Sequence, residues 1–247
     1  MLTGLHRLGL EVKDVDATRA FYEDRLGFVP VEADSESGVA YAVGAGTEAA
    51  TLRFRRPTEV PRGGVHTHYA FSTTPQAYAR WWQRLSDLDP VEFSFGAVDS
   101  LYVYDPAGHC VEIGGFDSEG EGSRSDIADD TIPPLSGLFE VVLEVTDLPT
   151  AEDRYRRLGF EVVDRGQRRR RVRLSGPVDI ELWEPQLGIA DARGGLHVDL
   201  AFAAPDPDAA VEAGGPWPGD VLSIPDGRLV VDDDGHVLTF VRAGGGR

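Results

Sequence analysis

The sequence predicts an α+β protein built from repeated β-α-β-β-β units. Four short motifs occur twice in the same order, about 130 residues apart, which indicates a tandem duplication. Residues 10–14 return as 143–147, 25–28 as 157–160, 63–71 as 194–202, and 105–109 as 232–236. Alternating apolar residues and glycine-terminated helical segments between these motifs supply the individual elements.

The first unit opens with a strand, because Leu8, Leu10 and Val12 alternate with other residues at the period of a half-buried strand. Asp16 is expected to cap a helix that runs to Leu26, with Gly27 as its left-handed end. Apolar runs at 28–31, 38–43 and 50–54 are separated by turn residues and predict three further strands.

The second unit repeats this order: a strand at 65–72, a helix from Pro75 to about Leu88, and strands at 91–95, 100–104 and 110–114. Residues 117–137 are rich in Ser, Gly, Asp and Glu, a composition that buries little apolar surface. We therefore expect a domain at 1–116, a linker at 117–137 and a second domain at 138–247.

Composition narrows the class of protein. No apolar stretch approaches the roughly 20 residues of a membrane span and the first residues do not form a signal peptide, so a cytoplasmic protein without a membrane partner is expected. A net charge of −18 argues against binding to nucleic acid. Since Cys110 is the only cysteine, any metal must be held by histidine and carboxylates.

Two motifs of the first half carry a family resemblance. Residues 10–14 with 21–28, and the closing stretch 104–112, resemble the vicinal-oxygen-chelate superfamily of glyoxalases, bleomycin-resistance proteins and extradiol dioxygenases. The resemblance implies two tandem domains, each with two β-α-β-β-β units that form a curved mixed sheet around a cavity, with the helices outside. It also implies a divalent metal held by side chains of the first and last strands.

Within the first half, the family's ligand positions fall on His68 and Glu112, but also on Arg7 and Arg53. Arginine stays protonated and cannot coordinate a cation. His66 lies two residues before His68 on the same strand face, so we expect it to be the third ligand. Two imidazoles and one carboxylate suit iron, zinc, manganese or nickel.

The matching positions of the second half are Glu140, Glu181, Asp199 and Thr239, with His197 nearby. Three carboxylates without a cation would repel one another. We therefore expect the second domain to carry a degenerate site.

The expected function is that of a metal-dependent lyase, isomerase or oxygenase acting on a small anionic oxygenated substrate, as a monomer or homodimer. Arg7, Arg53 and Tyr104 would bind substrate, and Tyr102 would assist catalysis. Glu11 is expected to be a general base or a simple partner of Arg7. The histidine of the extradiol signature is missing from 91–95, which argues against catechol cleavage.

The alternative is a metal-free small-molecule binding or resistance protein of the bleomycin-resistance type. Trp81, Trp82, Tyr102 and Tyr104 would supply its aromatic surface, although tryptophans on a helix also pack in cores.

Overall fold

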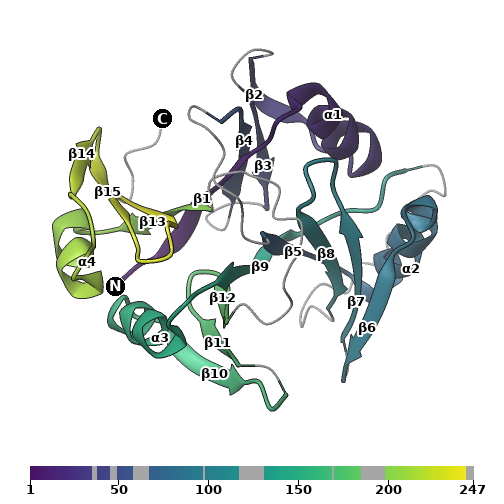
Figure 1. Cartoon of the computed structure of the whole chain (residues 1–247). Coiled ribbons are helices and arrows are strands. Elements are labelled where there is room, and N and C mark those ends of the chain that lie inside the picture. Colours follow the sequence, from purple (N-terminus) through teal and green to yellow (C-terminus); the bar gives the residue numbers. More distant parts are fainter. Residues whose placement is uncertain are drawn as a thin grey trace.

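The computed structural model describes residues 1–34, 38–44, 49–57, 67–96, 98–116, 131–168, 170–184 and 198–242. These residues form two eight-stranded mixed sheets, each with its helices packed against one face (Figure 1). The α+β class and the curved mixed sheets predicted from the sequence are thereby confirmed. The predicted linker lies mostly outside the described residues.

Four β-α-β-β-β units follow one another along the chain. The first contains β1 (Gly4–Glu11), α1 (Val15–Arg19) continued by the π-helix η1 (Ala20–Arg25), β2 (Pro30–Asp34), β3 (Gly38–Val43) and β4 (Ala50–Arg55). The second contains β5 (His68–Thr73), α2 (Pro75–Arg84), the short 3-10 helix η3 (Ser86–Leu88), β6 (Val91–Phe95), β7 (Val98–Tyr104) and β8 (Cys110–Gly115).

The second half repeats the pattern. Its third unit contains β9 (Gly137–Glu144), α3 (Leu148–Arg157), β10 (Glu161–Arg165), β11 (Arg171–Ser175) and β12 (Asp179–Trp183). The fourth contains β13 (Asp199–Ala204), α4 (Pro207–Gly214), β14 (Leu222–Ile224), β15 (Gly227–Val231) and β16 (Val237–Arg242).

Each sheet combines one unit from either half of the chain. Sheet A has the order β14-β15-β16-β13-β1-β4-β3-β2, and sheet B has the order β10-β11-β12-β9-β5-β8-β7-β6. The central pairs, β1 with β13 and β5 with β9, are antiparallel and join the halves. This pairing differs from the expected one, in which both units of a half share one sheet.

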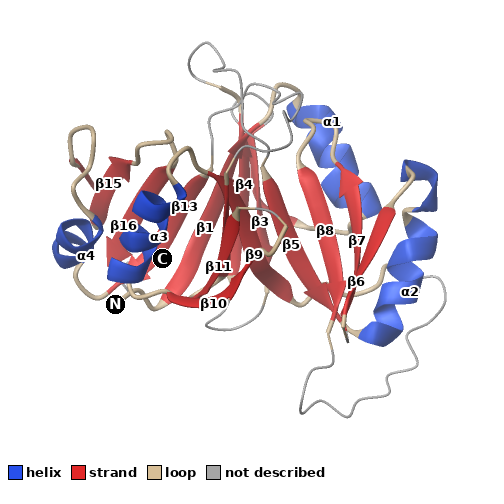
Figure 2. Ribbon diagram, turned by 60° about the horizontal axis from the view of Figure 1, so that its bottom comes forward, coloured by secondary structure: helices blue, strands red, loops and turns tan. Residues whose placement is uncertain are grey.

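The two units of one half still pack against each other, through their helix-covered faces. The ring of Phe28 lies 5.4 Å from that of Phe71, and the Tyr22 hydroxyl contacts Tyr69 and, at 3.1 Å, Asp105. Phe160 and Phe202 make the corresponding contact in the second half, with ring centroids 5.8 Å apart. The buried core therefore lies between the sheets. The opposite face of each sheet is covered by no helix of the described residues and is called the helix-free face below (Figure 2).

The helix ends follow the sequence closely, with one shift. Asp14, and not Asp16, caps α1, because its carboxylate accepts from the backbone N–H of Ala17. Gly27 has a φ of 77°, as a left-handed helix stop requires. Pro75 opens α2 behind the capping residue Thr74. No helix in the described part of the chain is long and apolar enough to cross a membrane.

Candidate metal centre

The register of sheet B brings together side chains that are distant in the sequence. Glu112 on β8, Ala70 on β5 and Glu140 on β9 are neighbours in one row across three strands. His68 lies two residues before Ala70, so its side chain points to the same helix-free face. The small side chain of Ala70 leaves space between the two carboxylates and the imidazole.

A bulge on β9 contributes to this arrangement. The pairing of β9 with β5 shifts between Leu138 and Glu140, and β1 has the same irregularity between Leu5 and Arg7. Bulges change the direction of the side chain that follows them. Glu140 and Arg7 therefore occupy equivalent positions in the two sheets, as the sequence repeat also indicates.

His68, Glu112 and Glu140 each offer a ligand atom, and these atoms all lie within 4.8 Å of one another. All three residues are buried, with exposed fractions of 5%, 4% and 6%. The Nε2 atom of His68 lies 2.9 Å from the Oε2 atom of Glu112. Since metal–ligand bonds of about 2.0–2.2 Å place donor atoms roughly 3 to 4 Å apart, small side-chain rotations would let one ion contact all three.

Two arginines of β11 and a third glutamate surround the three residues. Glu181 on β12 accepts hydrogen bonds from Arg171 at 2.8 Å and from the indole N–H of Trp183 at 2.6 Å. Arg173 contacts Glu140 at 3.1 Å and Asp179 at 2.8 Å. Trp183 also lies beside His68, with ring centroids 6.4 Å apart.

Negative charges outnumber positive charges around these residues. Glu112, Glu140, Asp179 and Glu181 face only two guanidiniums of the described residues, those of Arg171 and Arg173. Burial and then the neighbouring Glu181 raise the pKa of Glu140 to about 8, although Arg173 opposes the shift. A divalent cation would neutralise the excess, so the donor set fits a metal.

Tyr102 borders the same place. Its ring lies 5.5 Å from that of His68 and 5.5 Å from that of Phe93 on the edge strand β6. Burial and the adjacent Glu112 carboxylate raise the pKa of Tyr102, so its phenol stays protonated at physiological pH. Tyr104 follows on the same face and is 63% exposed.

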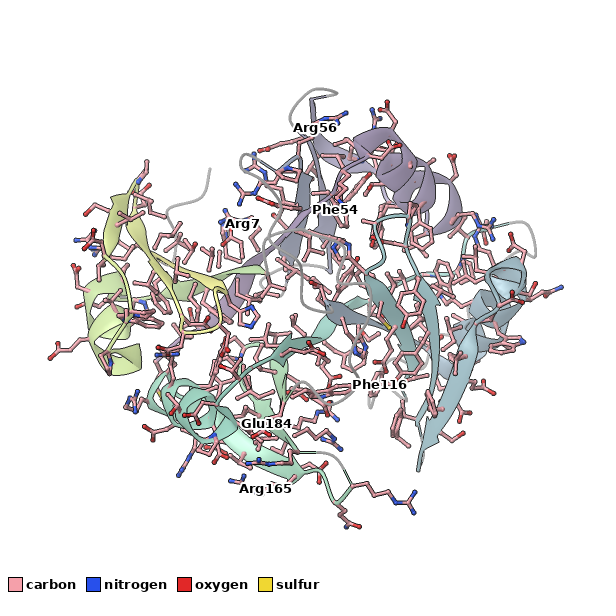
Figure 3. All side chains as sticks on the ribbon, in the orientation of Figure 1. Arg7, Phe54, Arg56, Phe116, Arg165 and Glu184 are labelled. Atoms are coloured by element: carbon pink, nitrogen blue, oxygen red, sulfur yellow. The ribbon has the colours of Figure 1, made fainter. Side chains whose placement is uncertain are left out.

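The residues proposed from the sequence are thus divided between two places. His68, Glu112 and Tyr102 lie together in sheet B, and His66 lies outside the described residues. Arg7, Arg53 and Glu11 lie in sheet A, where Glu11 pairs with Arg55 at 3.3 Å. Figure 3 places Arg7 beside β1, well apart from Phe116, which follows β8. The arginines therefore do not share a cavity with His68, contrary to the expectation.

The expected degenerate site of the second half is divided in the same way. Glu140 and Glu181 join the sheet B residues, whereas Asp199 and Thr239 face Arg7 in sheet A. The sequence contained a signal for this division. Two of the four ligand positions of the first half are arginines, and the equivalent positions of the second half are Glu140 and Glu181. Exchange of units gives one set with four carboxylate or imidazole groups and another containing two arginines.

Comparison with known proteins agrees with the fold. The family model described as Glyoxalase/Bleomycin resistance protein/Dioxygenase superfamily matches residues 4–113. These residues belong to that superfamily. Among curated proteins the comparison finds no match.

Similarity in fold to solved structures covers both halves of the chain. A putative dioxygenase from Bacillus subtilis subsp. subtilis str. 168 is similar with a TM-score of 0.75 and 16% identity, covering 99% of this chain and 86% of that one. Glyoxalase I from Zea mays has a TM-score of 0.65 and 16% identity, covering 97% and 92%. At such low identity the likeness shows the fold alone.

Proposed function

We propose that the protein is a divalent-metal-dependent enzyme, of lyase, isomerase or oxygenase type, that acts on a small oxygenated molecule at the helix-free face of sheet B. The observation that carries the proposal is the buried set of His68, Glu112 and Glu140, together with its excess of negative charge. Burial of unbalanced carboxylates is costly unless a cation offsets them.

His68, Glu112 and Glu140 would hold the metal, and one imidazole with two carboxylates suits iron, zinc, manganese or nickel. When bound, such an ion polarises neighbouring oxygens of a substrate and stabilises negative charge that develops on them. Arg173 holds Glu140 in place, and Arg171 with Trp183 holds Glu181.

Tyr102 would act on the substrate as a hydrogen-bond donor. Because its raised pKa keeps the phenol protonated, it donates to an oxygen that gains negative charge during the reaction. The neighbouring Phe93 and Phe95 are 54% and 60% exposed, and they would pack against an apolar part of the substrate.

The substrate of this site is proposed to bind without a guanidinium clamp. Arg171 and Arg173 are each bound to two carboxylates, and Arg7 and Arg53 lie in the other sheet. A neutral or weakly acidic substrate with two neighbouring oxygens therefore fits better than the anionic one expected from the sequence.

The competing function is metal-free binding of a small aromatic molecule. The direct contact of His68 with Glu112 favours it, because the imidazole already has a partner, and so do the exposed rings of Phe93 and Phe95. Trp81 does not contribute to such a surface, since it is fully buried.

Metal content distinguishes the two functions. Protein purified without chelator, and chelated protein titrated with Mn²⁺, Zn²⁺, Ni²⁺ or Fe²⁺ under anaerobic conditions, should bind one ion per chain. His68→Ala, Glu112→Ala and Glu140→Ala should each lose most of this affinity, whereas the control Arg53→Gln in sheet A should retain it. Equal metal in wild type and all three alanine variants would refute the site, and no metal in any form would favour the binding protein.

A further inference from the structure

The helix-free face of sheet A carries a group of arginines where sheet B carries acids. Arg7 on β1 is equivalent to Glu140, and Arg53 on β4 is equivalent to Glu181. Parallel pairing sets Gly9 beside Arg53 and Glu11 beside Arg55, so all these side chains belong to one face. An arginine at the position of Glu140 leaves this face unsuited to a cation.

These arginines are only partly neutralised. Arg7 donates through Nη2 to Asp199 at 3.0 Å, and the other oxygen of Asp199 accepts from the Thr239 hydroxyl at 3.1 Å. Arg55 pairs with Glu11 at 3.3 Å. Arg53 is exposed and makes no hydrogen bond or ion pair to any described residue.

The strands around these guanidiniums carry small side chains. Ala40 and Ala42 on β3 face Arg53 and Thr51, and Ala201 on β13 faces Arg7. Gly9 adjoins Asp199 so closely that an added Cβ would lie 3.1 Å from the Cβ of Asp199. The Asp199 side chain therefore covers Gly9, whereas the alanines of β3 leave the other side of Arg53 open. A small planar molecule there would meet the Arg53 guanidinium and few bulky side chains.

We propose that this face is a second, metal-independent binding site for a small organic carboxylate, with Arg53 as the principal donor and Arg7 as the second. A guanidinium presents two parallel N–H groups that match the two oxygens of a carboxylate. Among the described residues at the centre of the face, on β1, β4, β13 and β16, three arginines lie with two carboxylates, Glu11 and Asp199. A further carboxylate, Glu32, lies on the edge strand β2, beyond β3.

At the centre of the face the three arginines exceed the two carboxylates by one charge, in contrast to the chain as a whole, which has a net charge of −18. The surrounding negative field disfavours a dissolved anion, so binding here requires a specific contact and not general attraction. The duplication has thus produced two faces of opposite preference, one for a cation and one for a carboxylate.

Benzoate is a suitable probe, with benzamide as its neutral isostere. Chelated protein at constant ionic strength should bind benzoate saturably, with a Kd of about 1 mM or below, and should not bind benzamide. Arg53→Gln should weaken benzoate binding about tenfold, because it removes charge-assisted hydrogen bonds from an exposed side chain without disturbing the core. Glu112→Gln in sheet B should leave it unchanged.

Absence of saturable benzoate binding would overturn the proposal, as would an affinity unchanged by Arg53→Gln or shared equally by benzamide. Inorganic phosphate that binds in preference to benzoate would overturn the carboxylate assignment. Thermal unfolding of each variant shows that it is folded. Because the protein is kept metal-free, these results do not depend on whether sheet B binds a metal.

Discussion

Replacement of Glu140 by glutamine should have opposite effects on stability with and without metal. The glutamine side chain keeps the shape of the glutamate and can still accept a hydrogen bond from Arg173, but it carries no charge. In metal-free protein the substitution removes a buried carboxylate whose ionisation is unfavourable. In the presence of metal it removes one of the three proposed ligands.

The magnitude follows from the pKa of Glu140, which folding raises from 4.5 to about 8. Because this carboxyl pKa is raised, the contribution of Glu140 to the free energy of unfolding is fully present below pH 4.5 and is lost as the pH rises through 8. At pH 7 the loss is about 3 kcal/mol, since each pKa unit corresponds to about 1.4 kcal/mol. For a chain of this size that is a change in Tm of roughly 6–12 °C, as an upper limit.

Thermal unfolding with chelator at pH 5, 7 and 9 measures the first effect. Relative to wild type, Glu140→Gln should be only slightly more stable at pH 5, and the difference in stability should approach its full value by pH 9. Glu161→Gln is the matched control, because it removes the same charge from the exposed strand β10 and should change stability by less than about 0.5 kcal/mol.

Repetition with saturating Mn²⁺ measures the second effect. Wild type should gain stability in proportion to its metal affinity, and Glu140→Gln should gain far less. Destabilisation of Glu140→Gln at every pH in chelator would refute the burial cost assigned to this carboxylate. A response of the variant to Mn²⁺ equal to that of wild type would refute its role as a ligand.

Three further predictions concern charge and backbone. Stability should rise with potassium chloride up to molar concentrations, because screening relieves the repulsion of a chain with net charge −18, and an unchanged or lowered Tm would contradict this. Metal uptake at pH 7 should release about one proton, that of Glu140, and almost none at pH 9.5, as titration calorimetry in buffers of different ionisation enthalpy would show. Gly38→Ala should cost roughly 1–3 kcal/mol in urea unfolding, because its φ is 153° and a Cβ would lie 2.1 Å from the carbonyl oxygen of Phe54, whereas Gly4→Ala, with open space, should be neutral.

Much of the fold could be predicted because it depends on local chemistry. Gly27 ends the first helix and Pro75 begins α2, as glycine and proline do in such sequence patterns. The strands agree with the alternation of apolar residues. The repeated motif 105–109 has a structural role of the same local kind. The Asp105 carboxylate accepts from the backbone N–H groups of Ala107 and His109, and Gly108 has a φ of 90°.

The pairing of the units could not be predicted in this way. Repeated motifs show which segments resemble each other, but β1 and β9 have equivalent edges, and either could pair with β5. This choice decides the site. Expected pairing would set His68 and Glu112 beside Arg7, whereas the observed pairing sets them beside Glu140. The repeat alone therefore gives the position of Glu140 in its unit but not its place beside His68.

The observed pairing also gives the charges of the second half a physical explanation. Glu140 and Glu181, together on a sheet with Asp199, would repel one another. In the structure Arg173 and Arg171 hold the two glutamates, and Asp199 lies with Arg7 across the β1–β13 pair. Each helix-free face draws its four key positions equally from the two halves, so neither half contains a complete set. The β5–β9 pair that joins the halves is therefore also the contact that brings Glu140 to His68, and a metal held there would stabilise the junction of the halves as well as the site.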